Sequence, residues 1–154
     1  MFHDSPKVRL PTSAAFASVE CRNETLYFSG GDIDNVFYRV AAPKNTRPYF
    51  TLPRIRAKHI GCPVIGGIRT KADEWVTPRL RVLPMGWSWS LWFCQSLVEQ
   101  VGRVSGQSDI DKIADRTSHP QLLPQTVEHA KYVDNFISLG HDPNSVSLSE
   151  KGHV

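Results

Sequence analysis

The segment at residues 131–139 constrains the fold more than any other part of the sequence. It is mainly apolar, but Asp134 and Asn135 stand together at its centre, and Gly140 follows its end. Acidic and amide side chains in the middle of a strand-like run are typical of the turn of a β-hairpin. The sequence therefore predicts a hairpin with a carboxylate at its tip, and an antiparallel sheet that includes this hairpin.

A long helix is predicted after Pro84-Met85-Gly86. Ser88 or Ser90 is expected to cap its start, and Gly106 is expected to end it. Shorter apolar runs predict strands at residues 26–29, 49–52 and 75–82, and a strand or a strand-to-helix turn at 33–40. Together these elements predict a mixed α+β fold. The helix is indicated by one apolar stripe at helical spacing, formed by Cys94, Leu97, Val98, Val101 and Val104.

Length and composition indicate the class of protein. The chain has 154 residues, which is about the size of one domain. It contains no run of ~18 apolar residues that could span a membrane, and its first residues do not resemble a signal peptide. Its three scattered cysteines match neither a disulfide framework nor a zinc site. These features predict a soluble intracellular protein, located in the cytoplasm or the nucleus.

Charge is distributed unevenly along the chain. Residues 35–82 carry ten basic and two acidic side chains, a net charge of +8. Residues 1–34 and 83–154 carry net charges of −2 and −3. This distribution predicts a surface that faces a polyanion, next to a separate site built from carboxylates.

Two carboxylates are placed where they suggest metal chemistry. Asp32 directly follows a predicted strand, and Asp134 stands at the tip of the predicted hairpin. A carboxylate that ends an apolar strand is poorly solvated unless it is paired or holds a cation. If the two are brought together, they form a hard-oxygen site of the kind that Mg²⁺ prefers. Such a site can hold two ions ~3.5–4 Å apart and promote an in-line phosphoryl transfer.

Three segments, taken in order, resemble the motifs of the palm domain of reverse transcriptases. Asp32 followed by Phe37-Tyr38 is similar to the first motif. The second has the form LPxGW…S…Q, and the third is Tyr-x-Asp-Asp, with Asn135 in place of its second Asp. The resemblance covers about residues 7–140 and is nearest to retroelement enzymes with this Asp-Asn variant. The matching residues are Leu83-Pro84-Met85-Gly86-Trp87, Ser90 and Gln95 for the second motif, and Tyr132-Val133-Asp134-Asn135 for the third.

The resemblance implies a polymerase palm, an antiparallel sheet packed on helices, over residues 32–140. Its motifs lie at 32–40, 83–95 and 132–135, with partial fingers at 1–31, no thumb, and a flexible tail at 141–154. The implied activity is RNA-directed DNA synthesis, in which a dNTP is added to a primer 3′-hydroxyl on an RNA or DNA template. Two Mg²⁺ or Mn²⁺ ions are the implied cofactors. The missing fingers and thumb segments are expected from a larger polyprotein, and no membrane partner is expected.

The resemblance also implies roles for individual residues. Asp32 and Asp134 correspond to the catalytic carboxylates, which hold metal together with the carbonyl of Ile33. Phe37 occupies the position that excludes a 2′-hydroxyl, and Ile33 belongs with it to the nucleotide-binding set. The chain departs from the family at Met85, where a glutamine is frequent, and at Leu91 and Trp92, which replace a proline and a small residue. The nucleotide-binding set is completed by Met85, Gly86 and Gln95.

Two other functions remain open at this stage. The chain could be a catalytically inactive remnant that binds nucleic acid through its basic block at residues 35–82. It could also be a viral-type RNA-dependent RNA polymerase palm, which likewise carries an Asp-Asn variant of the third motif. Phe37 argues against the second alternative, because use of ribonucleotides requires a group that accepts the 2′-hydroxyl.

Overall fold

The computed structural model describes residues 2–20, 25–61, 64–117 and 122–151 of the 154-residue chain. It is a mixed α+β structure with antiparallel sheets, as the sequence predicts. The chain separates into two compact units rather than one. Unit 1 comprises Met1–Val36 and Gly86–Val154, and unit 2 comprises Phe37–Met85.

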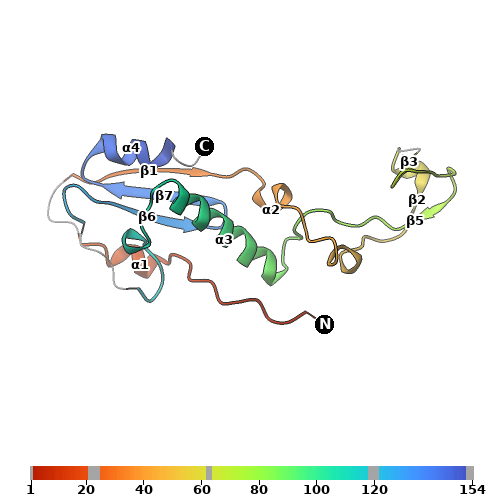
Figure 1. Ribbon diagram of the computed structural model, residues 1–154, viewed down its shortest axis with the longest axis horizontal. Helices are drawn as coiled ribbons and strands as arrows, with labels where there is room; N and C mark the ends of the chain where they lie inside the picture. Colours follow the sequence, from red (N-terminus) through yellow and green to blue (C-terminus); the bar gives the residue numbers. More distant parts are fainter. Residues whose placement is uncertain (1, 21–24, 62–63, 118–121, 152–154) are drawn as a thin grey trace. The chain divides into compact units, whose positions relative to one another are not determined.

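Unit 1 is built on a three-stranded antiparallel sheet (Figure 1). Its strands are β1 (Tyr27–Asp32), β6 (Val127–Tyr132) and β7 (Asn135–Gly140), in the order β1-β7-β6. Strands β6 and β7 are joined by the two-residue turn Val133-Asp134, so the predicted hairpin with a carboxylate at its tip is confirmed. Because β7 lies between the other two strands, the hairpin forms two thirds of the sheet and fixes its register.

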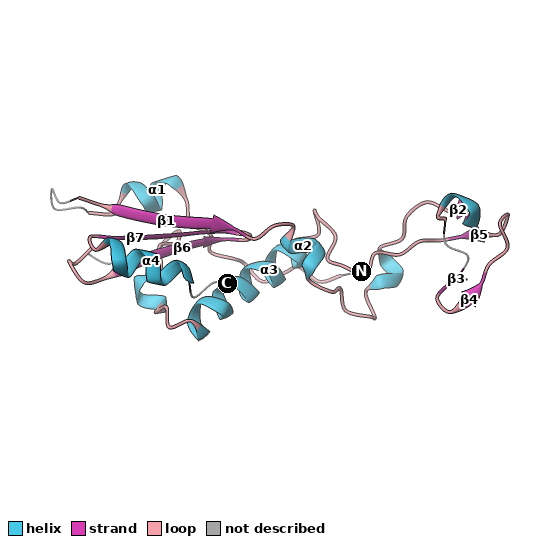
Figure 2. Ribbon diagram, turned by 90° about the horizontal axis from the view of Figure 1, so that it is seen from above, coloured by secondary structure: helices cyan, strands magenta, loops and turns pink. Residues whose placement is uncertain are grey.

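Helices lie on both faces of this sheet (Figure 2). Helix α1 (Ser13–Ala17) covers part of one face, where Ala15 packs with Ala130 and Ile113 in the hydrophobic core. Helices α3 (Ser88–Val104) and α4 (Pro143–Lys151) cover the opposite face, with α4 against β1 and β7 and α3 against β6. Helix α1 is too short to cover its face, and Phe28 on that face stays 77% exposed. This uncovered part of the sheet carries the end of β1.

Helix α3 confirms the predicted amphipathic helix but differs in detail. Cys94 and Val98 are buried against the sheet, whereas the stripe residues nearer the end of the helix, such as Val104, are exposed. The helix begins after Trp87 without a side-chain cap, so neither Ser88 nor Ser90 plays the expected role. Gly106 follows the helix at φ 89°, where its N–H donates to the carbonyl of Arg103, in agreement with the predicted end.

The segment at 141–154, which is expected to be a flexible tail, contains a helix, and its residues 152–154 lie outside the described residues. Residues 143–151 form α4, and Val146 is buried against Gly140 of β7. Asp142 caps the helix by accepting the N–H of Ser145 at 3.0 Å. A capping aspartate followed by a proline at the first helical position is a local start signal. Among the described residues, no helix combines the length and apolar character that a membrane span requires.

Unit 2 is formed by short elements with little shared core. After α2 (Val36–Arg39), which starts at the unit boundary, come η1 (Arg47–Tyr49) and η2 (Ala57–His59). Only residues 75–76 of the strand expected at 75–82 are a regular strand. In the strand expected at 49–52, Tyr49 ends η1 and Thr51 forms a single bridge with Arg79. Among the described residues of this unit, three apolar side chains are buried, Ala42, Ala57 and Leu83. The strands are β2 (Ile55–Arg56) paired with β5 (Trp75–Val76), and β3 (Val64–Ile65) paired with β4 (Ile68–Arg69).

Candidate functional site

The end of β1 and the hairpin turn meet at one end of the unit 1 sheet. Asp32 lies opposite Asn135 in the β1–β7 register, and Asn135 lies opposite Tyr132 in the β6–β7 register. The N–H of Ile33 donates to the carbonyl of Asp134 at 2.7 Å. The structure therefore brings the predicted first and third motifs together, although they lie far apart in the sequence. Asp32 is exposed and Asp134 is half-buried, so solvent reaches both carboxylates.

The turn that carries Asp134 is strained. Val133 has a φ of 58°, a left-handed conformation that is a genuine outlier for a β-branched residue. Such a backbone conformation costs about 1–3 kcal/mol and persists only where the surrounding structure enforces it. The side chain of Val133 is 5% exposed, so burial contributes to holding this conformation.

Gln95 of α3 holds the strained turn through its side-chain amide. Its Oε1 accepts the N–H of Val133 at 2.8 Å, and its Nε2 donates to the carbonyl of Lys131 at 3.0 Å. The same Nε2 lies 2.9 Å from Oε1 of Glu99, and the Gln95 side chain is buried. Gln95 is one of the predicted nucleotide contacts, and in the structure its amide is engaged with the hairpin on both sides of the turn. It positions the backbone that carries Asp134.

The surroundings of Asp134 favour one negative charge at the turn. Asn135 donates from Nδ2 to Oδ1 of Asp134 at 2.8 Å, where a second aspartate would place a like charge. Cys94 is fully buried on α3, and burial, reinforced by the negative charge of Asp134, raises the pKa of its thiol to about 11. The thiol is therefore neutral at physiological pH and adds no second anion. Both neighbours keep the charge of the turn on the Asp134 carboxylate.

The remaining predicted residues fall into two groups. Gly86 belongs to unit 1, just before α3, and its φ of 87° is a backbone conformation that favours glycine. Phe37 and Met85 belong to unit 2, where Met85 Sδ lies 3.5 Å from the hydroxyl of Tyr38. Within unit 1 the structure thus gathers Asp32, Ile33 and Asp134, with Gln95 behind the turn.

The uncovered sheet face holds an open hollow beside the turn, which sequence reasoning did not find. Its volume is about 230 Å³, and it is mainly apolar. Residues from α1, β6 and β7 and from the segment before α1 meet there, and a helix as short as α1 leaves only a weak periodic signal in the sequence. The hollow extends the site along the sheet face that carries Asp32. Its lining includes Pro11, Phe16, Ala130, Tyr132, Asn135 and Ile137.

A buried polar cluster supports β6 from the other face. Lys131 Nζ lies 3.0 Å from Nδ1 of His129, and Lys112 Nζ lies 2.5 Å from Oε1 of Glu99. Burial, together with the charge of Lys131, lowers the pKa of His129 to about 4. Burial also lowers the pKa of Lys131 to about 8. Gly102 of α3 leaves the room for this cluster, because a Cβ there would lie 2.4 Å from Lys131 Nζ.

The donor set at the end of the sheet suits a hard cation. Within the described ranges, no three His, Cys, Asp or Glu side chains gather as a ready-made metal site. Asp32 and Asp134 supply carboxylate oxygens, and Ile33, whose N–H donates to the Asp134 carbonyl, supplies a backbone carbonyl. Mg²⁺ takes oxygen ligands and usually keeps several waters, binding through one or two carboxylates plus substrate phosphates. The residues present therefore fit an ion whose coordination is completed by water and substrate.

Comparison with known proteins gives no family for this chain. No protein-family model matches it, and no curated protein sequence matches it. The grounds for a function are therefore the order of the motifs along the chain and the geometry at the end of the unit 1 sheet.

Proposed function

We propose that the chain is the palm of an RNA-directed DNA polymerase of the reverse transcriptase type. One observation carries the proposal: the first and third motifs meet at the same end of one antiparallel sheet. Ile33 donates to the Asp134 carbonyl at 2.7 Å there, and Asp32 pairs with Asn135. Two-metal nucleotidyl transfer requires ligands that reach the same pair of ions, and the carboxylates of Asp32 and Asp134 at this end of the sheet support that role.

In this proposal Asp32, Asp134 and the carbonyl of Ile33 hold two divalent ions. When bound, such ions lower the pKa of a primer 3′-hydroxyl and neutralise the pyrophosphate leaving group. Gln95 has a positioning role, because its side chain fixes the backbone of the turn that carries Asp134. Asn135 orients the Asp134 carboxylate by donating to Oδ1. Small displacements of such groups cost about 100-fold in rate, which gives the buried amide of Gln95 its importance.

Substrates would be selected around this centre. By resemblance, the ring of Phe37 would exclude a 2′-hydroxyl, so that deoxynucleotides are favoured over ribonucleotides. Met85, Gly86 and Ile33 would contact the incoming nucleotide. The uncovered sheet face, with Tyr132 and Asn135 beside the apolar hollow, offers a surface for the primer terminus. Fingers and thumb segments from a larger polyprotein would hold the duplex, since grip on nucleic acid requires many phosphate contacts.

Metal binding by the purified chain tests the proposal directly. Calorimetric titration with Mn²⁺ should show binding that Asp32→Asn and Asp134→Asn each weaken by about tenfold or more, because each removes a charged ligand. Asp4→Asn is the matched control, since it removes the same charge from an exposed residue of the N-terminal segment. Primer extension, measured with Mn²⁺ and a large excess of protein, should be retained by the native chain and by Asp4→Asn. It should be weakened in Asp32→Asn and in Asp134→Asn. Mn²⁺ binding unchanged in both site variants would contradict the proposal.

A second candidate function is a catalytically inactive module that binds nucleic acid. It is favoured by the charge of unit 2, which carries ten basic and two acidic residues. Nucleic-acid binding without Mn²⁺ binding at Asp32 and Asp134 would select this alternative over the polymerase.

A further inference from the structure

Unit 2 presents an exposed tryptophan with two arginines close to its ring. Trp75 of β5 lies directly opposite Arg56 of β2, so both side chains project from the same face of the two-stranded ribbon. The guanidinium carbon of Arg56 lies 4.2 Å from the centroid of the Trp75 ring, and that of Arg54 lies 5.9 Å away. Arg56 is fixed further because its Nη1 donates to the carbonyl of Asp73. Trp75 nevertheless remains 49% exposed.

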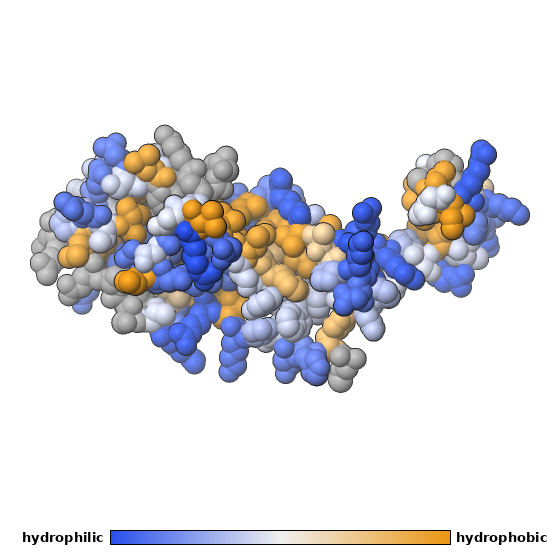
Figure 3. Space-filling view, viewed as in Figure 1, coloured by the Kyte–Doolittle hydropathy of each residue, from blue (hydrophilic) through white to orange (hydrophobic). Residues whose placement is uncertain are grey.

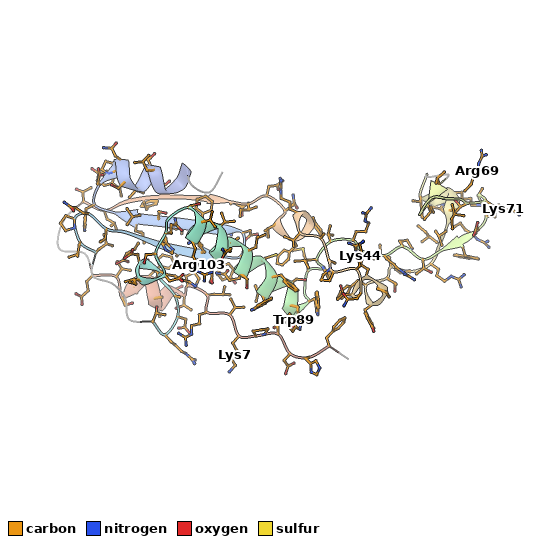
Figure 4. All side chains as sticks on the ribbon, in the orientation of Figure 1. Lys7, Lys44, Arg69, Lys71, Trp89 and Arg103 are labelled. Carbon is orange, nitrogen blue, oxygen red and sulfur yellow. The ribbon has the colours of Figure 1, made fainter. Side chains whose placement is uncertain are left out.

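The charges around this ring are predominantly positive. Unit 2 has a net charge of +8. In the region of β2 to β5, strongly hydrophilic side chains lie beside apolar ones (Figure 3). Arg69 and Lys71 point away from the ribbon (Figure 4). Both acidic residues of the unit are engaged locally, since Asp73 pairs with Lys58 at 3.1 Å and Glu74 accepts the backbone N–H of Lys71. A partner of this surface would therefore be an anion.

The same unit also exposes large apolar side chains. Tyr49 is 69% exposed, Leu52 is 48% exposed and Ile68 is 71% exposed. A two-stranded ribbon is marginally stable alone in water, and large exposed apolar patches mark surfaces that bind a partner. That partner must offer negative charge together with flat apolar faces. An unpaired nucleic-acid strand offers both, whereas a duplex keeps its bases stacked inside, and an inorganic polyanion offers charge alone.

We propose that unit 2 binds single-stranded nucleic acid, with an unpaired base stacked on the exposed part of Trp75 and with Arg54 and Arg56 on the neighbouring phosphates. Stacking of this kind tolerates any base, because every base has a π face. Binding therefore depends on strandedness and salt rather than on sequence. This inference goes beyond the proposed polymerase activity, because it involves neither Asp32, Asp134 nor a metal ion.

The first test compares three probes with the full chain in EDTA, so that no metal site contributes. They are single-stranded oligo(dT) of about 20 nucleotides, a duplex of the same length, and inorganic polyphosphate of similar charge. We expect the single strand to bind at least fivefold more tightly than either of the others. Equal affinity for polyphosphate, or tighter binding of the duplex, would overturn the inference. All three affinities are measured without a metal ion, so failure of the polymerase proposal, which the Mn²⁺ titration detects, stays distinguishable.

The second test separates stacking from charge. Trp75→Ala should weaken oligo(dT) binding about tenfold with an unchanged salt dependence, because it removes a base contact and no cation. Arg56→Gln should weaken binding and lower the slope of log K against log salt by about 0.7, the value for one phosphate on a single strand. Arg69→Gln is the matched control for charge, since it removes an exposed arginine from the other ribbon. Its effect on affinity should be smaller than that of Arg56→Gln.

Tryptophan fluorescence provides a second test of stacking on Trp75, which applies even if Trp75→Ala disturbs the fold. Oligo(dT) should quench the tryptophan emission of the native chain through stacking on Trp75. Trp75→Phe should bind within about threefold of the native chain, because a phenyl ring also stacks, but should lose this quench. Full affinity in Trp75→Ala would show that the surface binds through charge alone and would reject the inference. A quench that persists in Trp75→Phe would place the contact at another tryptophan and would reject it equally.

Discussion

The two units of this chain are stabilised in different ways. In unit 1 the sheet is covered by helices, and a buried glutamine and a buried charged cluster join α3 to the hairpin. Unit 2 has three buried apolar side chains among its described residues, two of them alanines. The units also carry opposite charges, −5 for unit 1 and +8 for unit 2. The comparison indicates that unit 1 has a core that specifies its structure, whereas unit 2 has little core and is expected to depend on a partner.

The largest test of this comparison is removal of the amide that holds the hairpin turn. Gln95→Ala leaves the N–H of Val133 and the carbonyl of Lys131 buried without their partner. A buried polar group left unpaired costs about 1–3 kcal/mol, so we expect a loss of about 3 kcal/mol in the free energy of unfolding. Urea denaturation of the full chain, monitored by circular dichroism, measures this loss. Gln100→Ala, at an exposed position on the same helix, should change stability by about 0.5 kcal/mol or less.

The second test concerns a buried carboxylate of β6. Both oxygens of Glu128 are buried and lack a hydrogen-bond partner among the described residues, and burial, followed by the charge of Asp111, raises its pKa to about 7. A group whose pKa is raised on folding stabilises the fold while protonated. That contribution is full below the unfolded pKa and is lost as the pH rises from about 4.5 through 7. Glu128→Gln should therefore stabilise unit 1 by about 2–3 kcal/mol at pH 8.

The pH profile of the difference between variant and native chain isolates Glu128. His129, whose pKa is lowered to about 4, loses its contribution in the opposite direction, as the pH falls below its unfolded value of 6.5. The two effects oppose each other in the native chain between about pH 4.5 and 6.5. Subtracting the free energy of unfolding of the native chain from that of Glu128→Gln removes the contribution of His129. A difference that is as large at pH 4.5 as at pH 8 would show that Glu128 is not the titrating group.

The third test concerns the dependence of unit 2 on a partner. Trypsin should cleave first after basic residues of unit 2, because its segments have little buried surface to oppose local opening. Single-stranded oligo(dT) should slow this cleavage about tenfold, because it binds the closed form of unit 2 and shifts the local opening equilibrium toward that form. Mass spectrometry of the early fragments identifies the first sites. First cleavage at Lys112 or Arg116 of unit 1 would reverse the proposed difference between the units.

The smallest expected effect is at the contact between α3 and the charged cluster. Gly102→Ala should cost about 1 kcal/mol of stability, although alanine favours a helix by a similar amount, because the added Cβ displaces Lys131. The double variant with Lys131→Met should show a coupling of about 1 kcal/mol between the two sites. Thermal denaturation of the four chains completes the cycle. Additive effects would show that the cluster does not require a glycine at residue 102.

Local signals allowed the sequence to predict most of unit 1. The polar pair inside an apolar run predicted the hairpin. Helix α3 was predicted by the apolar stripe of Cys94, Leu97, Val98, Val101 and Val104. The meeting of Asp32 with Asp134 followed from the resemblance and not from any local pattern. Helix α4 was not predicted because its amphipathic pattern is weak, although Asp142 followed by Pro143 is a local start signal.

Other features could not be predicted because they depend on tertiary contacts. His129 and Lys131 are polar residues of a strand, which a period-two pattern assigns to a solvated face, yet both are buried beneath α3. The role of Gln95 depends on which strand α3 covers, and this is absent from the helix pattern itself. The strand expected at 75–82 was shortened because unit 2 offers little core against which a longer sheet could pack.

The two ends of unit 2 lie close together, and this has an evolutionary consequence. The N–H of Leu83 donates to the carbonyl of Val40, and Ala41 pairs with Val82, so the two ends of the intervening segment lie next to each other. A segment with adjacent ends acts as an insertion that can be lengthened, shortened or exchanged. Each doubling of its length adds only about 0.6 kcal/mol of closure entropy. Variation between Ala41 and Val82 is therefore a low-cost route by which a lineage could alter nucleic-acid contacts while keeping the geometry of Asp32 and Asp134.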